Sequence, residues 1–266
     1  MNIRNESLSL NRLGLLMKRD VLSSYRSMLI RIAAASGILL MIDILNLWGG
    51  DADLYHHIEV FSAVLLVGGF FFTSAAFKEI HRKESNMAYL LLPASPLEKV
   101  LSRILFFSAG WIVIVILWYT LFTLISFGAG ELLFGTHFPM HGPFHPKLTM
   151  VYMHYMVLQS VFLAGAVYFR RTHFFKTVLA LFISLFIFLL IMALFSRIIF
   201  ASYFTGFFDV REAAVMQLEG LAPYRFGGFV SFMNVLKDVM YWGILAPAAW
   251  VFTYVRFREV QIKDGI

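Results

Sequence analysis

Cysteine is absent from this 266-residue chain, and charged residues make up only 14% of it. Without cysteine the chain forms no disulfide bond and offers no thiolate to a metal ion. Soluble domains carry about 25% charged residues, whereas here 60% of the residues are hydrophobic and Phe alone supplies 29. The composition therefore predicts an all-α, multi-pass membrane protein, and one membrane domain accounts for the length.

Several motifs are also missing. The chain has no G-x-x-x-x-G-K-[ST] phosphate loop, so it does not bind ATP in that manner, and it has neither H-E-x-x-H nor G-x-S-x-G. No pair of acidic residues lies deep inside two apolar runs, which disfavours an intramembrane aspartyl protease or a proton pump. No basic patch is interleaved with exposed aromatic residues, so we expect no nucleic-acid partner. The N-terminus has no short apolar core followed by a small-residue cleavage site, and we expect no cleaved signal peptide.

Apolar runs predict six membrane-spanning helices, at about residues 30–48, 58–77, 96–127, 149–169, 174–200 and 239–255. Gly69 and Thr73 in the second run would let a neighbouring helix approach closely. Six spans place both termini on one side of the membrane. Seventeen of the 22 Lys and Arg residues fall on that side, which predicts cytoplasmic N and C termini.

Residues 1–29 predict an amphipathic helix that lies along the cytoplasmic headgroups. Its apolar face would hold Leu10, Leu13, Met17, Val21, Tyr25 and Met28. The opposite face would hold Arg12, Arg19, Ser23 and Arg26. Packing of this helix against a soluble partner is the alternative.

Residues 201–238 are too polar to span and too aromatic for an open loop. Asp209 and Glu212 form a capping-box pattern, and Gly220 and Pro223 mark a helix end, which predicts a short helix at 210–219. Gly227 and Gly228 separate it from a second apolar piece at 229–235. We expect a pair of re-entrant helices on the extracytoplasmic side, between the fifth and sixth spans.

The densest polar block, residues 78–95, is a cytoplasmic loop that ends in a helix start signal. Ser95 suits the N-cap, Pro96 the first helical position and Glu98 the third, where Ser and Glu satisfy each other's backbone amides. The helix that follows would hold about 30 residues and measure roughly 45 Å, against a hydrocarbon core of about 30 Å. About three turns, bearing Lys99 and Arg103, should therefore stand outside the membrane on the loop side.

Other polar residues within or near the apolar runs offer weaker signals. Asp43 and Arg197 both sit near the outer boundary and could form an intramembrane pair, or could reach separately for the headgroups. Three histidines, His137, His141 and His145, have the four-residue spacing of a metal-binding face on a helix. Prolines between them prevent a continuous helix, so no metal site is predicted there. His154 and His173 are candidates for haem ligation, and His154 could equally be a hydrogen-bonded histidine.

The cytoplasmic loop at residues 78–95 resembles that of a known family. Glu79, Arg82, Lys83 and Glu84 form a charged stretch; Leu90, Leu91, Leu92, Pro93, Ala94 and Ser95 form a Leu-rich turn; and Glu98, Lys99 and Arg103 open the next helix. This pattern is similar to permease subunits of ABC transporters of the type-2 (type V, exporter-like) class. Ser85, Asn86 and Met87 stand where many members have Gly-Thr followed by Glu.

The resemblance implies an exporter subunit in a bacterial cytoplasmic (inner) membrane that is not itself an enzyme and binds no cofactor. A separate ATP-binding cassette subunit would bind ATP and push on a coupling helix from Glu84 to Leu92, and a second permease copy or close relative would complete the pathway. The implied ATPase-coupling residues are Lys83, Glu84, Met87, Tyr89, Leu90, Pro93, Ser95 and Glu98, with Arg12, Arg19 and Arg26 on the interface helix. Two alternatives remain: a haem or metal subunit or enzyme built around the five histidines, and a membrane anchor without transport activity.

Overall fold

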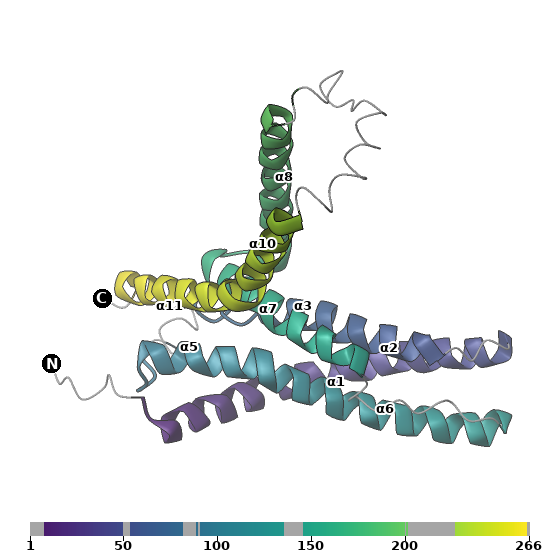
Figure 1. The fold of residues 1–266 in the computed structure, drawn as a ribbon. Coiled ribbons are helices and arrows are strands. Elements are labelled where there is room, and N and C mark those ends of the chain that lie inside the picture. Colours follow the sequence, from purple (N-terminus) through teal and green to yellow (C-terminus); the bar gives the residue numbers. More distant parts are fainter. Residues whose placement is uncertain are drawn as a thin grey trace.

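The computed structural model describes residues 8–49, 54–81, 89, 91–135, 146–199, 201 and 227–264, and every regular element within them is a helix (Figure 1). The protein is an all-α membrane protein. Helical runs long and apolar enough to cross a bilayer are Pro96–Leu132, Pro146–Tyr168, His173–Phe195 and Ser231–Ile262. The first two predicted spans correspond to shorter apolar helices, Met28–Met41 and Ile58–Ser74. The six-span count and the sidedness stay predictions.

The N-terminal segment and the first apolar run form one continuous helix, α1, Leu10–Gly49. The sequence predicts an interface helix followed by a separate span, but no Pro or helix-ending Gly interrupts residues 10–45, so the backbone continues. The N-terminal half of α1 buries Leu13, Leu16 and Asp20, while Leu10 stays 76% exposed. The face of α1 that is buried is therefore rotated about the helix axis relative to the predicted apolar face.

The third predicted span is a single long helical run and begins at Pro96, as expected. It consists of α5, Pro96–Leu105, the π turn η3, Phe106–Gly110, and α6, Trp111–Phe134. Gly135, with φ of 63°, ends it in the left-handed conformation that Gly adopts at low cost. Over its 39 residues the run measures roughly 58 Å, about twice the hydrocarbon thickness. The charged turns of α5, through Arg103, precede its apolar part and lie at the same end of the molecule as the start of α1 and the end of α11, Leu245–Asp264 (Figure 1).

A second π turn interrupts the helical run that corresponds to the second predicted span. The chain there forms α2, Leu54–Ala63, η2, Val64–Gly68, and α3, Gly69–Ser74. A π turn shifts the hydrogen-bond register and can leave a carbonyl without its usual partner. An aromatic side chain donates to one carbonyl in each of these two π turns: Trp111 Nε1 donates to Leu65 O at 3.1 Å, and Tyr155 Oη donates to Phe107 O at 2.6 Å.

The core is largely aromatic, and most of its residues come from α2, η2, α3, α5, η3, α6, α7 (Pro146–Tyr168) and α11. A Cβ on Gly69 would lie 2.3 Å from Tyr155 Cε2 and 2.7 Å from Trp111 Nε1, so only glycine fits there. Thr73, one turn on, is fully buried. The predicted close approach at Gly69 and Thr73 is confirmed.

Helix α8, His173–Ile199, rises away from this bundle (Figure 1). Its first turns pack on α7, where a Cβ on Gly165 would come within 2.0 Å of Thr177 Oγ1. Beyond them its side chains are exposed, including Phe182, Phe186 and Phe195 at 57–65%. An apolar surface of this kind needs lipid or another membrane helix against it.

The last predicted span differs from expectation at its start. Helix α10, Gly227–Asp238, continues without a break through the π turn η5, Val239–Ile244, into α11. The predicted separate helix at 229–235 is therefore wrong. The chain bends between α10 and α11 (Figure 1), because the π turn changes the helical register there and Pro247 has no amide for Gly243 O. The predicted helix at 210–219 lies outside the described residues.

Candidate functional site

The start of α5 is a capping box, as the sequence predicts. Ser95, with φ −67° and ψ 155°, accepts at Oγ from the Glu98 amide at 3.2 Å. Glu98 Oε2 accepts from the Ser95 amide at 2.8 Å, and Pro96 occupies the first helical position. Both ends of the motif are made, so the loop meets the helix in a fixed geometry.

The second carboxylate oxygen of Glu98 joins α5 to the start of α1. Oε1 accepts from Ser9 N at 2.7 Å, from Arg12 Nη2 at 2.9 Å and from Arg12 Nε at 3.1 Å. The Glu98 side chain is fully buried, while Arg12 keeps 31% of its side chain exposed. Burial raises the pKa of Glu98, but hydrogen bonds from Arg12, Ser9 and Ser95 more than offset this, and the net pKa is lowered.

One turn further along α5, Arg103 joins three segments. Its Nη2 lies 3.4 Å from Asp20 Oδ1 on α1 and 3.1 Å from Glu79 Oε2 in the segment after α3. Ser102 Oγ donates to Asp20 Oδ2 at 3.2 Å, and Arg19 Nη2 donates to Glu79 at 3.3 Å. Burial raises the pKa of Asp20, with Arg103 and Ser102 acting against that rise. Asp20 and Arg103 are 3% and 6% exposed, so this pair is desolvated.

Tyr89 brings the loop to the same place. Its ring is 2% exposed and has three cations near its face: Arg103 at 5.2 Å, Arg19 at 5.4 Å and Lys99 at 5.7 Å from the centroid. Each such contact contributes about 0.5–2 kcal/mol. The ring edge also faces Phe257 of α11, with centroids 6.3 Å apart. Burial raises the pKa of the Tyr89 hydroxyl, which stays protonated at neutral pH.

We call this assembly the buried charge cluster. It joins α1, the segment after α3, the loop and α5, and it consists of Arg12, Arg19, Asp20, Glu79, Tyr89, Glu98, Lys99, Ser102 and Arg103. It contains four cations and three carboxylates at one end of the long helical run. Displacing the loop must therefore move α5 and α1 with it, or break the ion pairs of Glu79 and the cation–π contacts of Tyr89.

The predicted site residues fall into three groups. Tyr89, Glu98, Arg12 and Arg19 meet in the cluster, while Ser95 caps α5 beside it and Pro93 is exposed. Arg26 lies apart and donates to Tyr25 Oη at 3.0 Å. Lys83, Glu84, Met87 and Leu90 lie outside the described residues.

Two residues of the cluster, the acceptor Asp20 and the donor Ser102, were not singled out from the sequence. Asp20 lies on the α1 face that also buries Leu13 and Leu16, at a spacing of three to four residues. An acidic residue on the apolar face of an otherwise basic helix is the signal that marks a buried partner for a cation.

The remaining candidates do not gather. The Asp43 side chain and the histidines at 137, 141 and 145 lie outside the described residues, so the pair with Arg197 stays a prediction. His154 Nδ1 lies 2.8 Å from the Tyr241 hydroxyl, and His173 stacks on His81 with ring centroids 5.1 Å apart. Within the described ranges no group of three or more His, Asp or Glu residues is arranged to hold a metal ion.

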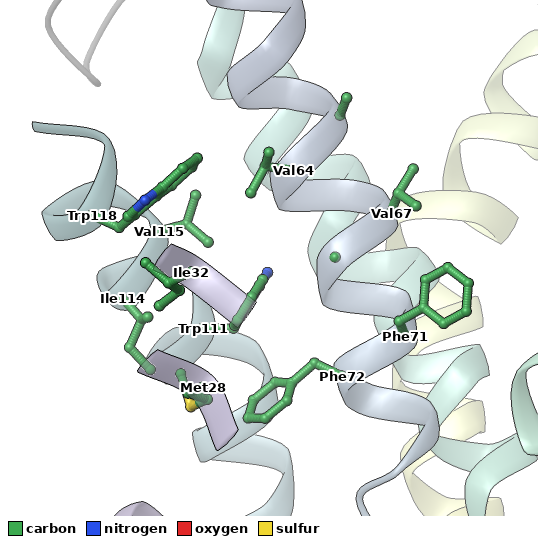
Figure 2. Close-up of a pocket in the computed structure, with 12 residues that line it drawn as sticks. Met28, Ile32, Val64, Val67, Phe71, Phe72, Trp111, Ile114, Val115 and Trp118 are labelled. Carbon is green, nitrogen blue, oxygen red and sulfur yellow. The ribbon is translucent and has the colours of Figure 1, made fainter. Parts of the chain in front are cut away.

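An apolar pocket of about 450 Å³ opens between α1, η2 with α3, and α6 (Figure 2). Trp111 and Trp118 form one wall, and Trp118 Nε1 donates to Ser36 Oγ at 2.7 Å. The full lining is Met28, Ile32, Ala63, Val64, Val67, Gly68, Phe71, Phe72, Trp111, Ile114, Val115 and Trp118. Such a pocket accepts hydrocarbon, and none of its described lining residues carries a charge.

The chain matches no protein-family model, no curated protein and no solved structure.

Proposed function

We propose that this chain is the membrane-spanning subunit of an ATP-driven ABC transporter of the type-2 (type V, exporter-like) class. The observation that supports this most is the buried charge cluster, in which Tyr89 of the loop contacts both Arg103 of α5 and Arg19 of α1. Glu98 of α5 pairs with Arg12 at the start of α1 in the same cluster. A subunit that converts a push from outside the membrane into helix movement needs such a connection at the base of a long helix.

In this mechanism a separate ATPase subunit binds and hydrolyses ATP and contacts the loop through the segment from Glu84 to Leu92. Movement of Tyr89 pulls on Arg103, Lys99 and Arg19, which belong to α5 and α1. Because α5 continues into α6, the displacement reaches the apolar pocket beside Trp111 and Trp118. This chain performs no chemistry of its own and binds no cofactor.

A single chain would form half of the pathway, and a second copy or close relative in the bacterial inner membrane would form the rest. The exposed apolar surface of α8 supports contact with lipid or with such a copy. The apolar pocket supports a lipidic or amphiphilic cargo.

The first experiment is affinity purification of the tagged chain in mild detergent, with identification of co-purifying proteins and an ATPase assay. A stoichiometric ATP-binding cassette subunit supports the proposal. A chain that carries no ATPase, in nanodiscs as well as in detergent, contradicts it and favours the membrane-anchor alternative.

Replacing Tyr89 with Leu should uncouple ATP hydrolysis from transport. Leu fills part of the space but has no ring face for Arg19, Lys99 and Arg103, so the loop no longer moves α5. We expect transport per ATP hydrolysed to fall at least about tenfold, which corresponds to roughly 1.4 kcal/mol of lost coupling. The measurement is paired transport and ATPase assays in proteoliposomes.

Tyr89→Phe is the matched control, because it keeps the ring and removes only a long 3.5 Å contact from Arg103 Nε. In this variant, transport per ATP hydrolysed should stay close to that of the unchanged protein. Equal losses in both variants, or normal coupling in Tyr89→Leu combined with Glu84→Arg, would show that the coupling contact lies elsewhere.

A further inference from the structure

A second cavity, distinct from the apolar pocket, lies where the segment after α3 meets the turn between α7 and α8. Its volume is about 580 Å³, and its polar lining includes Lys78, His81, Arg170, Arg171 and His173. We call it the basic pocket. It faces the loop end of the molecule, because residues 75–81 lead into the loop and residues 169–172 form the turn at the end of α7.

The charge of the basic pocket is of one sign. Among the residues that the structure describes, no acidic residue lines it, and neither Lys78, Arg170 nor Arg171 forms an ion pair with a carboxylate. Glu79, which follows Lys78 in the chain, is paired with Arg103 and Arg19. Three cations around one cavity repel one another, so an anion in the cavity would be stabilised by all three.

The basic pocket also has an aromatic wall. Phe71 and Phe174 stack with ring centroids 3.8 Å apart, and both line the cavity beside the cations. Phe175, also in the lining, is 67% exposed, and the apolar surface of α8 begins there. A ligand that fits both walls carries a negative charge at one end and hydrocarbon at the other.

Two histidines, His81 and His173, also line the cavity. Their rings stack with centroids 5.1 Å apart, and His81 Nε2 lies 3.0 Å from Ala166 O, so that nitrogen carries the hydrogen and donates. The His81 ring is therefore fixed against α7, and the position of the cavity is set by the packing of α3 on α7 and α8.

We propose that the basic pocket binds the phosphate headgroup of an anionic phospholipid from the leaflet on the loop side. Lys78, Arg170 and Arg171 bind the phosphate, and the acyl chains lie along Phe175 and the exposed side of α8. Arginine suits this role because its guanidinium forms paired hydrogen bonds to phosphate oxygens. The inference is independent of the transport proposal, because it concerns a different cavity and needs no ATPase.

The test titrates the purified full-length chain in neutral detergent with phosphatidylglycerol and counts bound lipid by native mass spectrometry. Phosphatidylcholine is the zwitterionic comparison, and inorganic phosphate and glycerol 3-phosphate are soluble competitors. We expect saturable binding of phosphatidylglycerol, at least about tenfold tighter than phosphatidylcholine, and only weak competition by the soluble anions. Arg170→Gln with Arg171→Gln should weaken phosphatidylglycerol binding at least about tenfold, and Lys78→Gln alone should weaken it less.

The matched control is Lys18→Gln with Arg258→Gln, which removes two exposed cations from other helices at the same end of the molecule. It should change the affinity by less than about twofold, as expected for distant surface charges screened by salt. If the control weakens binding as much as the pocket variant, the lipid responds only to overall charge and the proposal is wrong. If glycerol 3-phosphate displaces the lipid completely at equal concentration, the pocket binds soluble phosphate, which overturns the lipid assignment. All replaced residues are exposed, and unchanged thermal melting confirms that each variant is folded.

Discussion

Glu98 is the residue on which the base of α5 depends most. One of its oxygens completes the cap of its own helix, and the other accepts three hydrogen bonds from Ser9 and Arg12. A fully buried carboxylate would be strongly destabilising without these donors, so the contacts and the burial depend on each other.

Replacing Glu98 with Gln should lower the free energy of unfolding by about 3 kcal/mol, because Arg12 and two backbone amides lose a charged acceptor inside the protein. Glu259→Gln is the control: it breaks an exposed pair with Arg256 and should change stability by less than about 0.5 kcal/mol. Unfolding by SDS titration of the micelle-bound protein measures both. Equal effects would mean that the burial of Glu98 has no energetic consequence.

The same carboxylate predicts a pH dependence. Since its pKa in the folded protein is lowered from 4.5, its contribution to stability is fully present above pH 4.5 and is lost as the pH falls through the lower folded value. Protection of the α1 start from proteolysis should therefore persist at about pH 5 and fall under more acidic conditions. In Glu98→Gln this pH step should be absent.

At the scale of elements, local signals were enough to locate most helices but not their joins. The cap of α5 was predictable because Ser95, Pro96 and Glu98 lie within four residues of one another. The three π turns were not, because a change of register by one residue leaves the apolar pattern almost unaltered. A helix does begin at Gly227, but the short apolar piece predicted at 229–235 continues through η5 into α11 as far as Asp264.

The contact between α7 and α8 should depend on Gly165. In Gly165→Ala the new methyl group would come within 2.0 Å of Thr177 Oγ1 and 2.9 Å of its Cγ2, so α8 must shift. We expect a loss of about 1–3 kcal/mol, typical of overpacking. Gly128→Ala, in α6, places its new methyl group with no neighbouring atom within 4 Å and should be neutral or stabilising by up to about 1 kcal/mol.

Adding Thr177→Ala to Gly165→Ala should restore most of the lost stability, because it removes the two closest atoms, Oγ1 and Cγ2, and leaves only Cβ, at 3.0 Å. The coupling between the two changes, measured in a double-mutant cycle, identifies the contact itself. If the stability losses of the two single variants are additive, the contact between Gly165 and Thr177 does not determine how α7 packs on α8.

At the scale of the whole molecule, composition alone predicted the membrane class, whereas the buried charge cluster depends on contacts between residues more than 80 positions apart. Asp20 and Arg103 come together only after α1 packs on α5, which no local pattern encodes. The path of α8 away from the bundle likewise follows from the Gly165 contact and not from its apolar sequence, which resembles that of any span.

The absence of cysteine makes the predicted sidedness directly testable with single cysteines. Lys18→Cys and Arg258→Cys, near the two termini, should react with an impermeant maleimide only after cells are permeabilised. Leu132→Cys, at a site 88% exposed near the end of α6, and Lys147→Cys should react without permeabilisation of the membrane that holds the protein. Labelling of all four from one side would contradict the predicted topology.

The π turn η3 has a consequence for how this protein tolerates changes in length. It accommodates one residue more than an α-helix would need between α5 and α6. Deleting one residue within Phe106–Gly110 would therefore leave an ordinary helix, and Trp111 and Arg103 would stay close to their present partners. The same deletion in the regular turns of α6 would rotate everything beyond it by about 100° and shift it by about 1.5 Å. Gain or loss of a single codon should thus be survivable at η3 and damaging a few turns further on, which makes the π turn the place where related chains can differ in length.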